Sequence, residues 1–328
     1  MTPGQDSPDI SVVICAYTEQ RWPDLVAAVE SVQRQSVAPR EIVLVVDHNP
    51  ALHTRAEQQL AVRVVSNTDT QGLSGARNTG IAATGGALVA FLDDDAVAHP
   101  DWLAFLSMWH TDPEVMGAGG RLESNWINAR PRWFPPEFDW VVGCSYRGLP
   151  TTTAPIRNPL GGSMCIRREV FATVGAFVSG IGRVGSRPFG CEETELAIRA
   201  RHQWPKRVFL YEPRAIVRHT VPAERGQWRY FRSRCFAEGQ SKAYVSRLVG
   251  AQDGLASERT HVFRTLPLGV VRGFADVLRY GDLWGVARSG AIIAGLAWTA
   301  AGYLTGRWSQ RTSNPDAMLI LEPPRHAA

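Results

Sequence analysis

The sequence has few cysteines, and they lack the spacing that a zinc site needs. Five cysteines are scattered over 328 residues without the close pairs typical of zinc ligands. Their odd number also argues against a framework of disulfide bonds, so we expect a reducing cytosol. The opening segment MTPGQDSPDISVV has no basic stretch followed by an apolar one, and we expect no secretory signal there.

Two glycine-rich nucleotide-binding motifs are also missing. The turn that follows the first apolar run reads CAYTEQRW. It contains no glycine, which excludes the G-x-G-x-x-G turn of a dinucleotide-binding dehydrogenase. The pattern G-x-x-x-x-G-K-[ST] is absent as well, which excludes P-loop kinases and ATPases.

What is present is the composition of a folded protein with an uneven distribution of charge. Hydrophobic residues make up 45% of the chain, and the formal net charge is +4. Residues 201–328 hold 19 Lys and Arg against 9 Asp and Glu, so the preceding part carries a net negative charge. We expect the basic C-terminal part to meet an anionic surface or substrate.

Strand-like apolar runs alternate with helical patterns in the first hundred residues. The runs are apolar on both faces, which is typical of a parallel sheet covered by helices. Ligands of such sheets collect at the carboxyl ends of the strands. The expected strands are residues 10–17, 41–47, 62–67 and 87–94, and the expected helices lie within 24–35 and 72–86.

Polar residues follow all four expected strands. A surface turn or a helix N-cap would explain the acidic triplet Asp93 to Asp95 alone, but not polar groups at four strand ends. Two carboxylates one residue apart beyond a strand favour a site for Mg²⁺ or Mn²⁺, which in turn holds a diphosphate. We expect this triplet to lie at a solvent-facing strand end. The other residues at this rim are Tyr17, Thr18, Glu19, Asp47 and Asn67.

Six ordered segments resemble the motifs of the family 2 glycosyltransferases, which are inverting enzymes with the GT-A fold. The resemblance covers roughly residues 10–219 and rests on SVVICAYTE, EIVLVVD, GLSGARNTGI, FLDDDA, GGSMCIRREVFATVGAF and CEETELAIR. It implies an α/β fold of the GT-A type, with a Rossmann-like, mostly parallel sheet flanked by helices. The pattern of the residues that follow predicts a helical, membrane-associating C-terminal extension. The expected divisions are a glycosyltransferase domain at 8–222, with a nucleotide-sugar part at about 8–100 and an acceptor part at about 101–222, a helical extension at 223–310, and a flexible tail at 311–328.

The resemblance also implies residues for the nucleotide sugar and for a metal. Asp93 and Asp95 match the family's D-x-D motif, which binds Mn²⁺ or Mg²⁺, and His219 matches a position that faces the metal or the diphosphate. A lone histidine is also often a packed side chain, and Gly72, Gly75 and Gly80 also suit ordinary turns and helix packing. The implied metal ligands are Asp95, Asp93 and His219. The implied nucleotide-sugar contacts are Ala16, Tyr17, Glu19, Asp47, Arg77, Asp93 and Asp94, with Asn78 as a support for the loop.

The segment CEETELAIR resembles the family's acidic motif at the start of a helix, which implies Glu193 as the general base with Glu192 beside it. Most relatives have aspartate here, so either the acceptor lies slightly farther away or the register is shifted by one. First-turn glutamates that complement the helix dipole are the structural alternative. In the implied reaction, the base takes a proton from an acceptor hydroxyl, whose oxygen attacks the anomeric carbon opposite the diphosphate and inverts its configuration.

The region between the acidic triplet and Glu193 is rich in Trp, Pro and Arg. Its three tryptophans at 126, 133 and 140 either wedge a loop onto the core or stack on acceptor sugars. The loop RNPLGGSM resembles one that approaches the donor sugar, and its glycines permit close backbone contact. The candidate acceptor contacts are Trp133, Trp140, Gly162 and Ser163. The cations Arg229, Arg232, Arg234 and Lys242 of a later helical segment either bind an acceptor phosphate or remain solvated.

The C-terminal part predicts contact with a membrane surface. Residues 261–280 have the pattern of an in-plane amphipathic helix. Residues 289–304 are uncharged but shorter than the roughly 20 residues that a spanning helix needs. In-plane or re-entrant attachment, a single span and a soluble packing helix are all left open. The predicted apolar side contains Phe263, Leu266, Val270, Phe274 and Val277, and the polar side contains Arg272, Asp276 and Arg279.

The resulting hypothesis is a metal-dependent inverting glycosyltransferase at the cytoplasmic face of the cell membrane. Its expected partners are a nucleoside-diphosphate sugar, a lipid-linked or polysaccharide acceptor and the membrane surface, with no nucleic acid. UDP is the expected nucleotide, and GDP or dTDP would fit the same motifs. A sugar-phosphate nucleotidyltransferase is disfavoured because CAYTEQRW lacks a Gly-rich loop with Arg and Lys. A non-catalytic scaffold is disfavoured because Asp93, Asp95 and Glu193 are all present.

Overall fold

The computed structural model describes residues 8–179, 181–182, 190–250 and 260–312. The strands in these ranges form one mixed sheet with the order β3-β2-β1-β4-β8-β6-β9-β5, and β7 lies beside β9. The strands are β1 (Ile10–Ala16), β2 (Glu41–Val46), β3 (Arg63–Ser66), β4 (Leu88–Asp93), β5 (Ala96–Ala98), β6 (Val115–Trp126), β7 (Ala154–Ile156), β8 (Ser163–Arg167) and β9 (Val208–Val221).

The four predicted N-terminal strands are confirmed, and they pair in parallel. Beyond β4 the sheet becomes mixed, because β8 runs antiparallel to both β4 and β6, while β6 and β9 are parallel. Along β1, Val12 and Ile14 pack into one hydrophobic core and Val13 into the other. A strand with two buried faces has no polar side, which is why these runs are continuously apolar.

Helices cover both faces of the sheet. The first core lies under α1 (Trp22–Gln33), α2 (Pro50–Gln59) and α4 (Trp102–Ser107). The second core lies under α3 (Leu73–Ala83), α5 (Arg168–Val174) and α6 (Glu192–Gln203). Helix α2 was not predicted, although Asn49 caps it and Pro50 occupies its first turn, both of which are helix-start signals. Short helical turns complete the chain at η1 (Glu19–Arg21), η2 (Pro136–Val142) and η3 (Ala223–Gly226).

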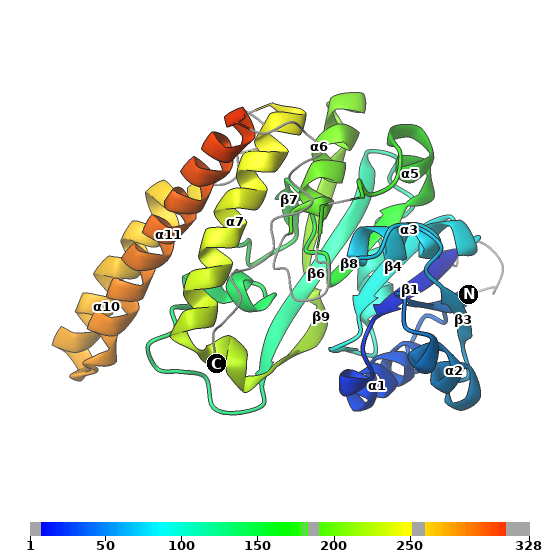
Figure 1. Ribbon diagram of the computed structural model, residues 1–328, viewed down its shortest axis with the longest axis horizontal. Coiled ribbons are helices and arrows are strands. Elements are labelled where there is room, and N and C mark those ends of the chain that lie inside the picture. Colours follow the sequence, from blue (N-terminus) through cyan, green and yellow to red (C-terminus); the bar gives the residue numbers. More distant parts are fainter. Residues whose placement is uncertain (1–7, 180, 183–189, 251–259, 313–328) are drawn as a thin grey trace.

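The C-terminal helices stack beside the sheet, at the end opposite β3 (Figure 1). They are α7 (Trp228–Val249), the π-turn η4 (His261–Thr265), α10 (Leu266–Tyr280) and α11 (Trp284–Thr312). Helix α11 packs along both α7 and α10. The α7 and α11 backbones approach closely because Gly239 faces Thr299 and Gly302 faces Phe236. Residues 313–328, which make up most of the predicted flexible tail, lie outside the described ranges.

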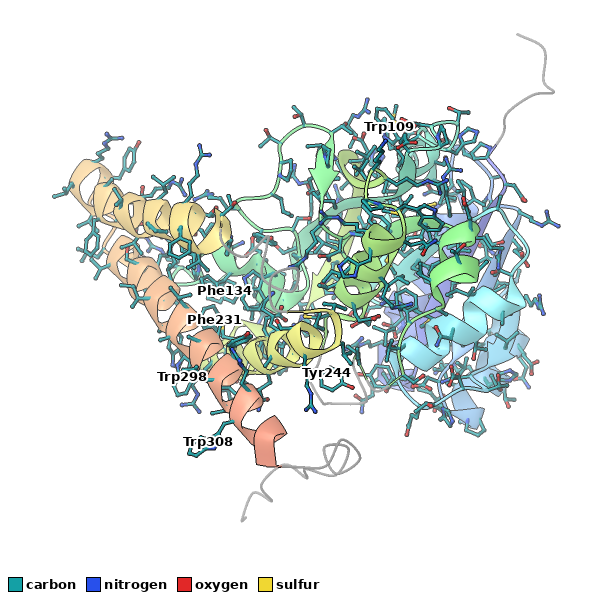
Figure 2. All side chains as sticks on the ribbon, turned by 90° about the horizontal axis from the view of Figure 1, so that it is seen from above. Trp109, Phe134, Phe231, Tyr244, Trp298 and Trp308 are labelled. Atoms are coloured by element: carbon teal, nitrogen blue, oxygen red, sulfur yellow. The ribbon has the colours of Figure 1, made fainter. Side chains whose placement is uncertain are left out.

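An aromatic cluster joins these helices to the Trp-rich region. Phe231 of α7 lies edge-on to Trp133 and Phe134, with ring centroids 5.5 and 5.4 Å apart. Phe138 of η2 also packs against Phe231, with ring centroids 5.3 Å apart. Figure 2 shows Phe134 and Phe231 on the inner side of the helical layer. The predicted division at residue 222 stays a prediction, since this cluster spans both sides of it.

The predicted apolar side of the amphipathic segment is divided in the structure. Leu266 and Val270 pack into the aromatic cluster, so they face protein and not the surroundings. These residues are covered because α10 lies against α11 and η2. The sequence pattern does not tell which apolar residues meet a neighbouring helix. The exposed apolar face of α10 consists of Leu268, Val271, Phe274 and Leu278, preceded by Phe263 of η4.

Helix α11 carries further exposed apolar residues. Trp298 and Trp308 project from it away from the sheet (Figure 2). Together with the exposed residues of α10, they form what we call the outer face of the helical layer. In the described ranges, no helix combines the length and the apolar character that a membrane crossing requires.

Candidate active site

The carboxyl ends of the parallel strands meet at one rim, as the sequence predicts. The register pairs Ala16 with Val46 and Cys15 with Asp93, so β1, β2 and β4 end level with one another. At this rim the Asn67 amide donates to Asp47 Oδ1 at 2.6 Å. The backbone N–H of Gly72 donates to Asp47 Oδ2 at 2.9 Å. Asp47 is therefore fixed by groups that follow β3.

The residues predicted around the first strand end take different positions. Ala16 and Tyr17 line the cavity described below, and Tyr17 is exposed. Glu19 does not line that cavity. Its carboxylate faces outward, 3.8 Å from Arg55.

The three consecutive aspartates lie in three different environments. Asp93 is partly exposed, and its carboxylate lies 3.7 Å from Arg77. Asp94 and Asp95 are buried, so the expectation that the whole triplet faces solvent is wrong. The cause is Arg21, which covers them and lies 3.2 Å from Asp94 and 3.1 Å from Asp95. Sequence reasoning missed this arginine, since nothing in EQRW marks it except its charge.

Asp95 is surrounded by cationic or protonatable groups. Its Oδ1 atom lies 3.1 Å from His219 Nε2, and its Oδ2 atom lies 3.5 Å from Arg225. Burial raises the pKa of Asp95, but His219, Arg225 and Arg21 outweigh burial and hold it well below its ordinary value. Arg225 is a second residue that sequence reasoning missed. Its guanidinium also donates to the Val142 carbonyl, which ties the Asp95 environment to η2.

Asp94 shows the opposite effect. Burial and the adjacent Asp95 raise its pKa to about 7, against the attraction of Arg21. Its Oδ2 atom is buried and makes no hydrogen bond in the described part of the chain. A buried polar atom without a partner is costly, which is typical of a site that a ligand completes.

Three side chains at this rim have the composition of a divalent-metal site. Donor atoms of Asp93, Asp95 and His219 all lie within 4.8 Å of one another. The pairing of Ala96 on β5 with His219 on β9 brings the histidine to the acidic triplet. Two carboxylates and one imidazole suit Mn²⁺, which accepts nitrogen as well as oxygen, better than they suit Mg²⁺. The residues present therefore fit a metal ion.

Arg77 is buried at the centre of the site. It donates to Glu192 Oε1 at 2.8 Å and to the Gly161 carbonyl at 3.0 Å. Burial lowers the pKa of Arg77, but Glu192 and Asp93 outweigh burial and raise it above its ordinary value. The Arg77 guanidinium thus remains charged while it links three parts of the site: the loop that contains Gly161, the start of α6 at Glu192, and Asp93 at the strand-end rim.

The residues near Arg77 on α3 mainly contact other parts of the protein and not the cavity. Asn78 bridges Asp69 and the backbone of Phe177, which supports the loop as predicted. Gly75 lies against the Thr70 backbone and Gly80 against Val13. Both glycines therefore have a packing role.

The adjacent glutamates Glu192 and Glu193 begin α6 but are held differently. Glu192 is buried against Arg77, and its Oε2 atom makes no hydrogen bond in the described residues. Glu193 lines the cavity, where burial and the charge of Glu192 raise its pKa to about 8. Cys191 precedes them with φ of 77°, a left-handed conformation that is strained for a residue with a Cβ. Glu195, one turn later, is an ion-pair partner of Arg199.

The predicted acceptor residues do not gather in one place. Gly162 lines the cavity and touches the Asp93 carboxylate so closely that an added Cβ would lie 2.6 Å from Oδ2. Ser163 is fully buried and accepts a hydrogen bond from Trp102 at 2.9 Å. Trp140 lines the cavity, whereas Trp133 packs in the aromatic cluster away from the lining.

A cavity of about 940 Å³ connects these groups. This volume lies at the upper end of the range for small-molecule sites. Its lining combines the strand-end rim, the Arg77 centre and the start of α6 with residues of η2, α7, η4 and α11. The rim and start-of-helix residues in the lining include Asp47, Arg77, Asp93, Asp94, Asp95, Glu192 and Glu193.

Comparison with known proteins identifies the family. The model of "Glycosyl transferase family 2" matches residues 11–175. The glucosyl-dolichyl phosphate glucuronosyltransferase of Haloferax volcanii is 33% identical over 244 residues, which are 73% of this chain and 78% of that protein. The succinoglycan biosynthesis protein ExoO of Rhizobium meliloti is 36% identical over 100 residues, 29% of this chain and 28% of that one.

Solved structures show the same fold. The mannosyltransferase PcManGT from Pyrobaculum calidifontis, in complex with GDP-Man and Mn²⁺, has a TM-score of 0.55 and 17% identity, covering 91% of this chain and 90% of that one. GalNAc-T7 with UDP, GalNAc and Mn²⁺ has a TM-score of 0.51 and 20% identity, covering 74% of this chain but only 50% of GalNAc-T7. The predicted GT-A architecture is confirmed, and the chain belongs to glycosyl transferase family 2.

Proposed function

We propose that the protein transfers a sugar from a nucleoside-diphosphate sugar to a hydroxyl group of a lipid-linked saccharide, with inversion at the anomeric carbon and with a requirement for Mn²⁺ or Mg²⁺. One observation carries this proposal. The strand-end carboxylates and Glu193 line the same cavity. A donor held by the first group and an acceptor held near the second would meet inside it.

The strand-end rim suits the nucleotide. Asp47 is fixed by Asn67 and Gly72, so its carboxylate is preorganised to accept hydrogen bonds from a base or ribose. Tyr17 exposes an aromatic ring beside it, on which a base can stack. Arg77 adds a permanent positive charge in the cavity. UDP is the nucleotide that we propose.

The diphosphate needs compensation for its charge. Asp93, Asp95 and His219 would hold the divalent ion, whose chemical contribution is to stabilise negative charge on the departing nucleoside diphosphate. His219, Arg225 and Arg21 hold the pKa of Asp95 well below its ordinary value, so its carboxylate is ionised at neutral pH. PcManGT and GalNAc-T7 were both solved with Mn²⁺, which agrees with the mixed oxygen and nitrogen donor set.

Glu193 is the proposed general base. Its carboxylate accepts the proton of the acceptor hydroxyl while that oxygen bonds to the anomeric carbon and the bond to the diphosphate breaks. Glu192 cannot serve as readily, because Arg77 holds its carboxylate at 2.8 Å. A pKa near 8 is suitable for a base that must both bind and release a proton close to neutral pH.

Two observations support a lipid-linked acceptor: the name of the Haloferax volcanii relative and the exposed apolar outer face of the helical layer. The Haloferax volcanii relative is named for a glucosyl-dolichyl phosphate acceptor, which is a lipid-linked sugar. The outer face exposes apolar side chains on α10 and α11, as a protein that meets a lipid surface would. We therefore propose that the enzyme lies in plane at the cytoplasmic face of the membrane, because nucleotide sugars are made in the cytosol.

The experiment is a ligand panel followed by analysis of the product. UDP-, GDP- and dTDP-sugars are added with and without Mn²⁺, and the melting temperature of the full-length protein is measured. A true donor stabilises the folded state only when the metal is present. The anomeric configuration of the transferred sugar is then read by NMR. Stabilisation by no nucleotide sugar, or retention of configuration, would overturn the proposal.

A further inference from the structure

The cavity extends well past the catalytic glutamates. Its lining also includes residues of α7, η4, α10 and α11, and several of these are apolar or aromatic. This apolar wall includes Tyr230, Leu266, Leu296, Thr299, Ala300 and Tyr303. Leu266 and Leu296 belong to or pack against the aromatic cluster, so this part of the wall is held by the protein core.

A charged group on α7 also lines the cavity. Arg234, Glu238 and Lys242 follow one another at four-residue spacing, so they share one face of α7, and all three line the cavity. Glu238 lies 3.5 Å from Arg234 and 3.2 Å from Lys242. Their side chains are only 9, 14 and 17% exposed in the order Arg234, Glu238 and Lys242.

This group is next to the start of α6. The Cys191 thiol donates to Glu238 at 3.5 Å, and the Gly190 N–H donates to Ser241, also on α7, at 3.2 Å. Contacts thus connect the strand-end rim to Glu192 through Arg77, and the start of α6 to the α7 charges through Cys191. No step of the proposed transfer uses the α7 charges.

Arg234 and Lys242 flank one carboxylate inside a cavity, which favours a role in binding an anion over the role of ordinary solvated side chains on a helix surface. Salt bridges at four-residue spacing commonly stabilise exposed helices, but here the side chains are largely removed from water. Such removal costs free energy, which a phosphate in contact with both cations would offset. Glu238 holds the two cations near each other, and so positions them for phosphate oxygens.

We propose that this part of the cavity binds the phosphate of the lipid carrier, with Arg234 and Lys242 as its contacts and with the first isoprenoid units lying along the apolar wall. The inference rests on the proposed function, because it treats the acceptor as lipid-linked. It assigns one part of the acceptor to each group of the cavity: the sugar hydroxyl to Glu193, the phosphate to the α7 charges, and the isoprenoid chain to the apolar wall.

The test measures binding of farnesyl phosphate to the full-length protein by titration calorimetry. Farnesol and inorganic phosphate serve as probes of the chain and of the phosphate alone. Lys242→Gln and Arg234→Gln are expected to weaken farnesyl phosphate binding about 10- to 100-fold, because each removes charged hydrogen bonds to the ligand. Arg229→Gln removes the same charge from an exposed position of α7 and should leave the affinity within about 2-fold.

A second variant tests the chain. Ala300→Trp places a bulky ring at the outer end of the apolar wall, at a position exposed enough to tolerate it. It should weaken the binding of farnesyl phosphate. The affinity for inorganic phosphate, measured as its ability to displace farnesyl phosphate, should stay unchanged. Equal affinity for farnesol and farnesyl phosphate, or an unchanged affinity in Lys242→Gln, would overturn the phosphate site. No effect of Ala300→Trp would overturn the path of the chain.

The outcome can be separated from that of the proposed function. Titration of UDP with Mn²⁺ into the same variants checks the donor site and the fold. Donor binding without farnesyl phosphate binding would overturn this inference alone. Farnesyl phosphate binding with the expected variant pattern, in a protein that no nucleotide sugar stabilises, would support this site and overturn the proposed function.

Discussion

Glu192 and Glu193 differ at the scale of single residues although they are adjacent in the sequence. Glu192 is committed to Arg77, whereas Glu193 lines the cavity with a raised pKa. We predict that Glu193→Gln lowers kcat by about 10²- to 10⁴-fold, since it removes the proton acceptor and preserves the shape. Donor affinity, measured by titration of the nucleotide sugar with Mn²⁺, should be retained.

Glu192→Gln is the matched comparison for this prediction. It weakens the ion pair with Arg77, so it should lower donor affinity and stability. The rise of kcat with pH should remain but move to lower pH, because the charge of Glu192 helps to raise the pKa of Glu193. An inactive Glu192→Gln beside an active Glu193→Gln would show that the base has been assigned one residue too late.

The raised pKa of Glu193 also predicts the response to pH. Transfer needs the ionised carboxylate, so kcat/KM should rise with pH and level off above about pH 8. Stability should change in the opposite direction, because the folded state holds this proton more tightly than the unfolded state. The contribution is full below pH 4.5, the ordinary pKa, and is lost as pH rises through about 8.

Glu193→Gln separates the two effects of pH. At pH 9 this variant should unfold at a higher denaturant concentration than wild type, by about 1–2 kcal/mol in free energy of unfolding, reduced from the full shift because the carboxyl borders an open cavity. At pH 4 the two proteins should be equally stable. A wild type that is the more stable of the two at pH 9 would contradict the assignment.

The rim carboxylates allow a test in which metal binding and stability are separated. Asp93 is partly exposed, so Asp93→Asn should abolish Mn²⁺-dependent UDP binding with little change in melting temperature. Asp95 is buried beside Arg21, Arg225 and His219, so Asp95→Asn should also cost about 3 kcal/mol of stability. Asp101→Asn is the control, because Asp101 is a carboxylate at the N-cap of α4 and does not line the cavity. Unchanged UDP affinity in both rim variants would refute the metal site.

At the scale of elements, the close approach of α7 and α11 depends on glycine. A Cβ at Gly302 would overlap the Phe236 backbone, which cannot move without moving α7. Gly302→Val should therefore lower stability by about 2–3 kcal/mol in chemical denaturation, through overpacking. It should also weaken farnesyl phosphate binding, because the cavity wall between these helices would shift.

Gly290 provides the control on the same helix. Nothing lies within 4 Å of a Cβ built there, so Gly290→Ala should stabilise the protein by about 0.5–1 kcal/mol through helix propensity. A loss of stability in Gly290→Ala as large as that in Gly302→Val would show that the helical layer tolerates no substitution in α11. The effect would then not be specific to the contact with α7.

At the scale of the whole molecule, the outer face and the basic C-terminal part predict binding to a membrane surface. The full-length protein should float with vesicles of phosphatidylcholine and phosphatidylglycerol in a 7:3 ratio. Flotation should weaken with salt, since screening reduces attraction to the anionic lipid. The paired substitution Phe274→Glu with Leu278→Glu on α10 should abolish it.

Met108→Glu is the control for flotation, because Met108 is also an exposed apolar residue but lies at the C-cap of α4, outside the helical layer. Loss of flotation in this variant would mean that any added negative charge suffices. Recovery of the wild-type protein in the unbound fraction at low salt would contradict the membrane prediction.

The strand-end rim could be predicted from sequence because it depends on local rules. A strand buried on both faces must be apolar throughout, so its polar residues accumulate where it ends, and parallel strands end at one edge. Asp47 and Asn67 meet for this reason, and so do Asp93 and Asp95. The resemblance of CEETELAIR to the family's acidic motif placed Glu193 at a helix start, and α6 indeed begins at Glu192.

What only the tertiary structure decided is which distant groups face these residues. Arg21 is 73 residues from Asp94, and Arg77 is 115 residues from Glu192, so no local pattern connects them. The same holds for α10, where Leu266 turned out to face protein and Leu278 to be exposed. The physical reason is that periodicity records which residues avoid water, whereas the identity of their neighbours depends on how separate elements pack.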